Sequence, residues 1–178
     1  MTSNLARLVR EHRWVVFLCL VFLILGALRL NDLSLYTDST RYVIWGTSFA
    51  HTIGFVDETQ PDPEDYVVNA PLYSVLIAPA LLFFPSSLLA AKVWTLFWGI
   101  GFILAFYTML RHFFGKTAAT LGLLPIVFHP LLLLLSTEVL SEAAFLTFVS
   151  VAFLALERLE RDGETNKLAK LTAALAKR

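Results

Sequence analysis

Asp38 is the first residue whose type and position could support catalysis. It lies in the run Tyr36-Thr37-Asp38-Ser39-Thr40-Arg41-Tyr42, directly before a stretch with helical periodicity. A carboxylate at such a position commonly caps a helix by accepting hydrogen bonds from backbone N–H groups. A carboxylate can also act as a general base that takes the proton of an acceptor hydroxyl. The two roles are compatible, so the sequence leaves both open.

Glu138 and Glu142 form a second acidic pair. They are four residues apart, so they share a helix face if the turn that begins at Ser136 is helical. Glu142 stands at the mouth of an apolar run, where an acid usually has a partner or a function. The alternative is an acid that starts a helix and is stabilised by the helix dipole, with Ser136 or Thr137 as the cap. We treat Glu142 as the second catalytic candidate and Glu138 as a binding candidate.

Three cationic groups, Arg41, Lys92 and His129, could contact a phosphate group. Each could instead anchor its helix at a membrane surface, which is the commoner role of long basic side chains. Tyr42, which follows Arg41 directly, completes the candidate binding set.

Other chemistries have weaker sequence signals. The remaining histidines, His12, His51 and His112, show no metal-ligand spacing, so we expect no cofactor. A divalent metal held by Asp38 and a glutamate stays open. The chain has neither a glycine-rich phosphate loop nor a basic, aromatic surface typical of nucleic-acid binding, so we expect no nucleic-acid partner.

These residues are set in a strongly apolar chain. Hydrophobic residues make up 57% of 178, charged residues 16%, and the mean hydropathy is +0.70. Soluble domains are about 45–50% apolar, so the composition predicts an all-α integral membrane protein. Four segments are candidates for transmembrane helices, at about 14–30, 88–110, 117–135 and 139–156.

Charge distribution predicts the orientation of these helices. Basic residues gather before Trp14, at Arg111–Lys116 and after Glu157, whereas the interval 31–69 contains seven acids and a single basic residue, Arg41. Positive loops stay in the cytoplasm. The sequence therefore predicts a multi-pass protein of the inner (plasma) membrane, with both termini cytoplasmic and the loop 31–87 external. Asp38, Glu138 and Glu142 then face the same compartment.

The external loop is expected to contain surface-lying helices. A helix beginning near Asp38 and ended by Gly54 carries an aromatic and aliphatic face formed by Tyr42, Trp45, Phe49 and Ile53. The segment 71–84 is short and contains Pro79, so a surface-lying or re-entrant helix is favoured over a crossing. After the last apolar segment, residues 161–178 are expected to form a cytoplasmic tail whose helix breaks at Gly163.

Several short motifs resemble one family. An external Asp precedes an Arg-Tyr helix, and further runs are Asn69-Ala70-Pro71-Leu72-Tyr73, Ala91-Lys92-Val93-Trp94, the basic turn 111–116 and Leu140–Phe145. In this order they resemble the N-terminal part of the GT-C membrane glycosyltransferases, the group related to protein O-mannosyltransferases and aminoarabinose transferases. The resemblance covers roughly residues 10–160, and we take 1–160 as a GT-C-like membrane module followed by the tail 161–178.

The resemblance implies an inverting transferase that moves a hexose or pentose from a polyprenyl-phosphate donor to an acceptor on the external face. It implies that Asp38 activates the acceptor. The chain departs from the family at Ser39, where a companion acid is common, and at Asn69-Ala70-Pro71, where a Lys-Pro-Pro-like run is usual. Family members have about eleven or more spans, whereas this chain has material for about four at roughly twenty residues each. Relative to the family, the chain looks truncated.

Two functional hypotheses follow. The first is an enzyme, either part of a full transferase or a half that needs a partner to complete its site. The second is an accessory subunit that retains the module without catalysis and packs its apolar helices and the Trp94–Trp98 region against a larger membrane complex. In both, the partners are membrane lipids and membrane proteins, joined in the first by the polyprenyl-phosphate sugar donor.

Overall fold

The computed structural model describes residues 11–32, 36–51, 54, 56 and 72–175, without the side chains of residues 162 and 164–175. Within these ranges the regular elements are α-helices, which confirms the all-helical class. They are α2 (Arg13–Arg29), α3 (Thr37–Ala50), α4 (Leu72–Phe83), α5 (Leu88–Val127), α6 (Pro130–Thr137) and α7 (Glu142–Leu175).

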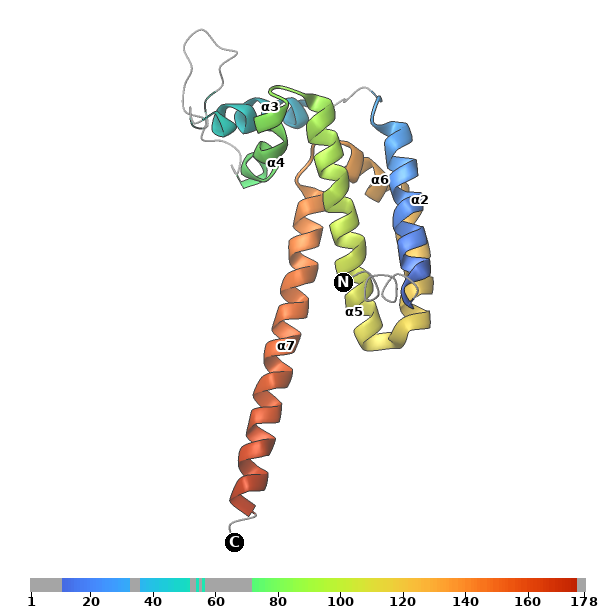
Figure 1. Cartoon of the computed structure of the whole chain (residues 1–178), viewed down its shortest axis with the longest axis vertical. Helices are drawn as coiled ribbons and strands as arrows, with labels where there is room; N and C mark the ends of the chain where they lie inside the picture. The colour runs from blue at the N-terminus through green and yellow to red at the C-terminus, as the bar shows by residue number, and fades with distance from the viewer. Residues whose placement is uncertain (1–10, 33–35, 52–53, 55, 57–71, 176–178) are drawn as a thin grey trace, which may run out of the picture.

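α5 is a helical hairpin, because its backbone reverses at Gly115. This residue has φ 79° and ψ 174°, far from helical values. Glycine adopts a positive φ at little cost, whereas a Cβ would strain it. Figure 1 shows the first arm of α5 running away from α3 and α4 and the second arm returning close to α2. α2, the two arms of α5 and the first part of α7 form the helical bundle.

The bundle core lies between α2 and the two arms of α5. Phe22, Ile103, Leu123 and Val127 have no exposed surface there. Gly99 allows α6 to approach α5, since a Cβ at this position would lie 2.4 Å from Ser136 Oγ and 3.0 Å from Phe22 Cε1. The packing of α6 against α5 at this point therefore requires a residue without a side chain.

Gly99→Ala is expected to lower the free energy of unfolding by about 1–3 kcal/mol, because the new methyl group must displace Ser136 or Phe22. Thermal unfolding of the purified chain in mild detergent measures the change. Gly163→Ala is the matched control: no atom lies within 4 Å of its added Cβ, and alanine favours the helix by up to about 1 kcal/mol. Equal destabilisation by the two substitutions would contradict the packing argument.

α3 and α4 lie together across one end of the bundle (Figure 1). The prediction of a helix beginning near Asp38 is confirmed. Its expected aromatic face is divided: Trp45 is buried, Tyr42 is half-buried and Phe49 is 38% exposed. Ile53 lies outside the described residues. The Trp94 indole donates a hydrogen bond of 2.7 Å to the Leu76 carbonyl, which ties α4 to α5.

The later elements differ from the expected ones in two places. The segment 117–135 is divided, because α5 ends at Val127 and α6 begins at Pro130 with His129 as its N-cap. Proline fits the first turn of a helix, where its missing N–H is not needed. The predicted break at Gly163 is wrong, because α7 continues through it to Leu175. One glycine costs a helix only about 1 kcal/mol relative to alanine.

In the part of the chain that the structure describes, one helix, Leu88–Val127, is long and apolar enough to cross a membrane. A second candidate arises if Pro130–Thr137 and Glu142–Arg161, which meet at 109°, are one broken span. The expected number of about four crossings stays a prediction.

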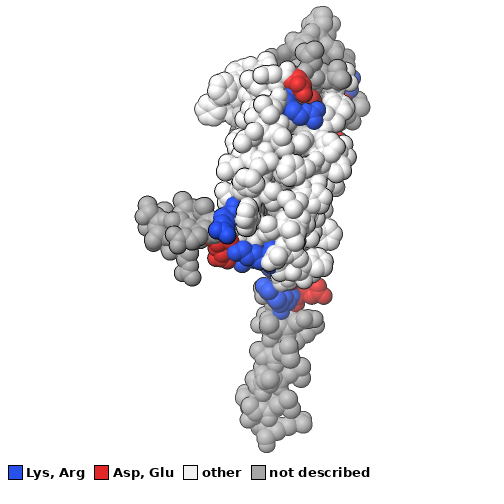
Figure 2. Space-filling view, turned by 90° about the vertical axis from the view of Figure 1, so that its right-hand side faces the viewer, with Lys and Arg blue, Asp and Glu red and all other residues white. Residues whose placement is uncertain are grey.

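The outside of the bundle is largely apolar. Phe17, Phe97, Phe153 and Leu156 are each more than half exposed. On the face shown in Figure 2, charged side chains gather at two levels, and the surface between them carries none. Along the sequence, α2 begins at Arg13 and ends at Arg29, so this apolar helix has a basic residue at each end.

Candidate functional site

A groove of about 570 Å³ separates α3 and α4 from the start of α7. Tyr42 of α3 and Tyr73 and Leu76 of α4 line one wall. Residues of α7 and the turn before it line the other wall, namely Ser141, Glu142, Ala144, Phe145 and Phe148. The groove is therefore an apolar and aromatic channel with a carboxylate at one end, and it brings together two candidates from distant parts of the sequence, Tyr42 and Glu142.

Glu142 is the first residue of α7, and its side chain is exposed. The N-terminal dipole of α7 stabilises a negative charge at this position. No Lys, Arg or His among the described residues lies within ion-pair distance of its carboxylate. Glu142 can therefore interact with a molecule that enters the groove, so its placement agrees with either a catalytic or a binding role.

Asp38 is the second residue of α3, so of the two roles that the sequence left open, the N-cap role does not fit its position. Tyr36 occupies the N-cap position, and its side chain makes no capping hydrogen bond. The Asp38 side chain is 54% exposed and lies 3.8 Å from the Arg41 guanidinium, one helical turn away. Tyr42 also follows Asp38 by one turn, so both lie on one side of α3. Asp38 thus reaches the solvent near the groove wall that Tyr42 forms.

Tyr42 is held in place by Tyr73. Their ring centroids lie 4.9 Å apart in an edge-to-face arrangement. The Tyr73 hydroxyl lies 2.6 Å from Thr95 Oγ1, which donates its own hydrogen bond to the Ala91 carbonyl. Tyr73 is therefore the donor of the pair. Burial, together with the neighbouring Tyr42 and Glu142, raises the pKa of Tyr73 well above its ordinary value, so its phenol keeps this proton.

Lys92 and Glu138 form a buried ion pair behind the groove. Lys92 Nζ lies 3.4 Å from Glu138 Oε1 and donates a 2.8 Å hydrogen bond to the Asp32 carbonyl. The side chains of Lys92 and Glu138 are only 2% and 6% exposed. These contacts connect three segments: the residues that follow α2, the start of α5, and the turn between α6 and α7. Lys92 does not extend to solvent as an interface anchor would.

Glu138 and Glu142 do not share a helix face. Glu138 has extended backbone angles, φ −97° and ψ 154°, and ends α6, whereas Glu142 begins α7. Residues 138–141 form a turn between the two helices, which directs Glu138 inward and leaves Glu142 outside. The shared face required a helix that continues from Ser136 to Glu142, and this condition is not met.

The three expected phosphate contacts are not gathered at one place. Arg41 lies on α3 beside Tyr42, Lys92 is enclosed with Glu138, and His129 caps α6. The His129 Nδ1 atom accepts a 3.2 Å hydrogen bond from the Leu131 N–H, so this nitrogen already caps the N-terminus of α6. A search of the described ranges for three or more His, Cys, Asp or Glu side chains placed to bind a metal finds none.

Sequence reasoning missed most of the groove wall. Tyr73 and Leu76 come from a segment read only as a short apolar helix, and Phe145 and Phe148 from a run read only as a transmembrane helix. The Asn69–Tyr73 motif was a signal for Tyr73. Nothing in the sequence marked Phe145 and Phe148 as lining a groove, because phenylalanine is common along an apolar helix.

No family model matches the chain, and neither a curated protein nor a solved structure matches it. Functional inference therefore depends on the groove and its residues.

Proposed function

We propose that the chain is a multi-pass membrane protein in which four segments cross the bilayer: α2, the first arm of α5, the second arm of α5 together with α6, and α7. The exposed phenylalanines of α5 and α7 and the uncharged zone in Figure 2 support this placement. From Arg13 to Arg29 α2 spans about 24 Å at 1.5 Å per residue, close to the hydrocarbon thickness of about 30 Å. In this arrangement the basic turn at Gly115 and both termini are cytoplasmic, in the inner (plasma) membrane, while α3 and α4 lie at the external surface.

Within this arrangement the chain acts as a glycosyltransferase-like module. The observation that carries the proposal is the groove that joins Tyr42 and Glu142 across α3, α4 and α7. Its aromatic walls suit the isoprenoid part of a polyprenyl-phosphate sugar. In the proposed arrangement the sugar lies at the external end of the groove, near Asp38. Arg41 is the cation nearest this site on α3 and contacts the donor phosphate.

Asp38 acts as the general base in the proposed reaction. It takes the proton of the acceptor hydroxyl, whose oxygen attacks the anomeric carbon of the donor sugar. A glycosidic bond forms, the bond between that carbon and the phosphate oxygen breaks, and the polyprenyl phosphate leaves with the electron pair. Attack from the side opposite the phosphate inverts the anomeric centre.

Labelling with a photoactivatable polyprenyl phosphate tests the donor site. The probe is expected to label residues 72–76 and 141–148 in the reconstituted full chain. Phe145→Ala combined with Phe148→Ala is expected to lower this labelling severalfold, because both aromatic side chains of the α7 wall are removed. Labelling spread evenly over the exposed residues of α2, α5 and α7 would contradict the proposal.

The matched control replaces Phe97 and Phe153 with alanine. These side chains are 58% and 60% exposed and belong to α5 and α7 but not to the groove. They are expected to leave labelling unchanged. An equal loss in both double variants would indicate a general effect on lipid contact and overturn the assignment of the site.

A second candidate function is an accessory subunit of a larger membrane complex. One observation favours it: Lys92, one of the three cations expected at the donor phosphate, is buried in an ion pair with Glu138 and cannot reach a donor. This reading predicts stoichiometric membrane-protein partners after purification in mild detergent. It also predicts that Asp38→Asn leaves the complex and its activity unchanged, an outcome opposite to that expected for the enzyme.

A further inference from the structure

A second groove, of about 450 Å³, lies at the opposite end of the bundle, between α2 and the second arm of α5. Trp14 and Phe17 line it from α2, and Leu121 and Leu124 line it from α5. These four side chains are between 41% and 60% exposed. The groove opens on the outer surface of the bundle, so in a membrane a lipid chain must cover it.

One cationic group lines this groove and a second lies next to one of its lining residues. Lys116, the residue after the Gly115 turn, lines it, and Thr117 follows within the same wall. The Arg13 guanidinium lies 5.5 Å from the centre of the Trp14 ring. In the described ranges, neither Lys116 nor Arg13 forms an ion pair. Both charges are therefore free to bind an anion.

The nearby carboxylate does not cancel these charges. Glu11 lies 3.2 Å from Arg111 Nη2 and 3.7 Å from His12 Nε2, so other groups already pair with it. Figure 2 shows Lys and Arg side chains at this end of the molecule, at the lower edge of the uncharged zone. The end of the groove keeps a net positive charge.

The other two large grooves lack this combination. The groove between Tyr42 and Glu142 carries a carboxylate. The groove beside Pro79, Phe84 and Trp94 has no charged residue in its lining. Of these three grooves in the described part of the chain, the α2–α5 groove is the one lined by a lysine.

We infer that this groove binds one anionic phospholipid. One acyl chain lies along Phe17, Leu121 and Leu124, and the phosphate oxygens contact Lys116 Nζ and the Arg13 guanidinium. Basic pockets between helices on the cytoplasmic side recognise anionic headgroups by this chemistry. The inference uses the membrane placement proposed above but not the sugar-transfer reaction.

Fluorescence quenching of Trp14 tests this inference. The full chain is reconstituted in phosphatidylcholine vesicles that contain either brominated phosphatidylglycerol or brominated phosphatidylcholine at the same mole fraction. The signal of the Trp14→Phe variant is subtracted to isolate Trp14. Brominated phosphatidylglycerol is expected to quench Trp14 more strongly, with an apparent preference of about fivefold per cation.

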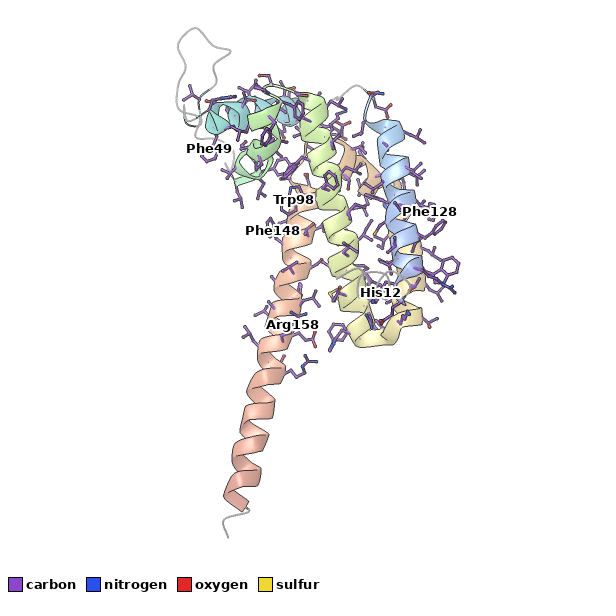
Figure 3. The ribbon with its side chains drawn as sticks, viewed as in Figure 1. His12, Phe49, Trp98, Phe128, Phe148 and Arg158 are labelled. Carbon is purple, nitrogen blue, oxygen red and sulfur yellow. The ribbon has the colours of Figure 1, made fainter. Side chains whose placement is uncertain are left out.

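Two variants identify the cause. Lys116→Gln is expected to lower the preference about fivefold. Arg158 is an exposed cation on α7, a helix that contributes no residue to the lining of this groove, whereas His12 directly precedes α2 (Figure 3). Arg158→Gln is therefore expected to leave the lipid preference unchanged. Equal quenching by the two brominated lipids, or equal effects of the two variants, would overturn the lipid site and leave the membrane placement standing. Absence of Trp14 quenching by both lipids would overturn the membrane placement and the lipid site together.

Discussion

Lys92→Met is expected to lower the free energy of unfolding by about 3–5 kcal/mol. The substitution leaves the Glu138 carboxylate buried without its cation, and Glu138 Oε2 has no hydrogen-bond partner among the described residues. The carboxylate must then protonate or draw water into the fold, and either change destabilises the turn between α6 and α7. Thermal unfolding of the purified chain in mild detergent measures the loss.

Arg29→Met provides a control with the same geometry and different burial. Arg29 Nε and Asp32 Oδ2 are also 3.4 Å apart, but the two side chains are 37% and 57% exposed. Breaking this exposed pair is expected to cost only about 0.2–1 kcal/mol. The double substitution Lys92→Met with Glu138→Leu is expected to recover most of the lost stability, because it removes both buried charges. Equal costs for Lys92→Met and Arg29→Met would show that burial of the pair is unimportant.

Asp38→Asn is expected to reduce sugar transfer by about 10²–10⁴-fold, the usual contribution of a general base. The amide keeps the size of the side chain but cannot accept the acceptor proton. The measurement is transfer from a polyprenyl-phosphate sugar by the reconstituted chain, followed as release of polyprenyl phosphate. Labelling by the photoactivatable donor is expected to remain, because Asp38 does not line the groove.

Asp32→Asn is the matched control for this experiment. Asp32 is another exposed acid near the same end of the bundle, and among the described residues its side chain pairs with Arg29. Its carbonyl, which Lys92 uses, is unchanged by the substitution. Transfer is expected to continue in this variant. If Asp38→Asn retains full transfer, Asp38 is not the base and the accessory-subunit function becomes the better explanation.

The helices themselves could be predicted because they depend on local sequence. Apolar runs bounded by charged or helix-breaking residues located α2, both arms of α5 and the membrane-length part of α7. The acid-rich interval with helical periodicity located α3. The partners of Lys92 and Tyr73 could not be predicted in this way, because Glu138 and Thr95 lie 46 and 22 residues away in the sequence.

Tertiary packing also decided the roles of the charged residues. Lys92 looked like an interface anchor because it lies near a helix end, but the close approach of Asp32 and Glu138 turns it inward. Glu138 and Glu142 are four residues apart, a spacing that would place them on one face of a continuous helix. The turn between α6 and α7 separates them instead. Spacing predicts a shared face only where one helix continues between the residues.

The length of α7 has a mechanical consequence. Its 34 residues extend over about 50 Å in one unbroken helix, and its first turns form one wall of the groove at Glu142. Figure 1 shows its far end well past the turn of α5. A tilt of about 10° around the first turn would move that far end by about 9 Å, while the groove wall shifts by a small fraction of that distance. Because of this length, any slight tilt of α7 that widens the groove at Glu142 is amplified into a large displacement of its far end.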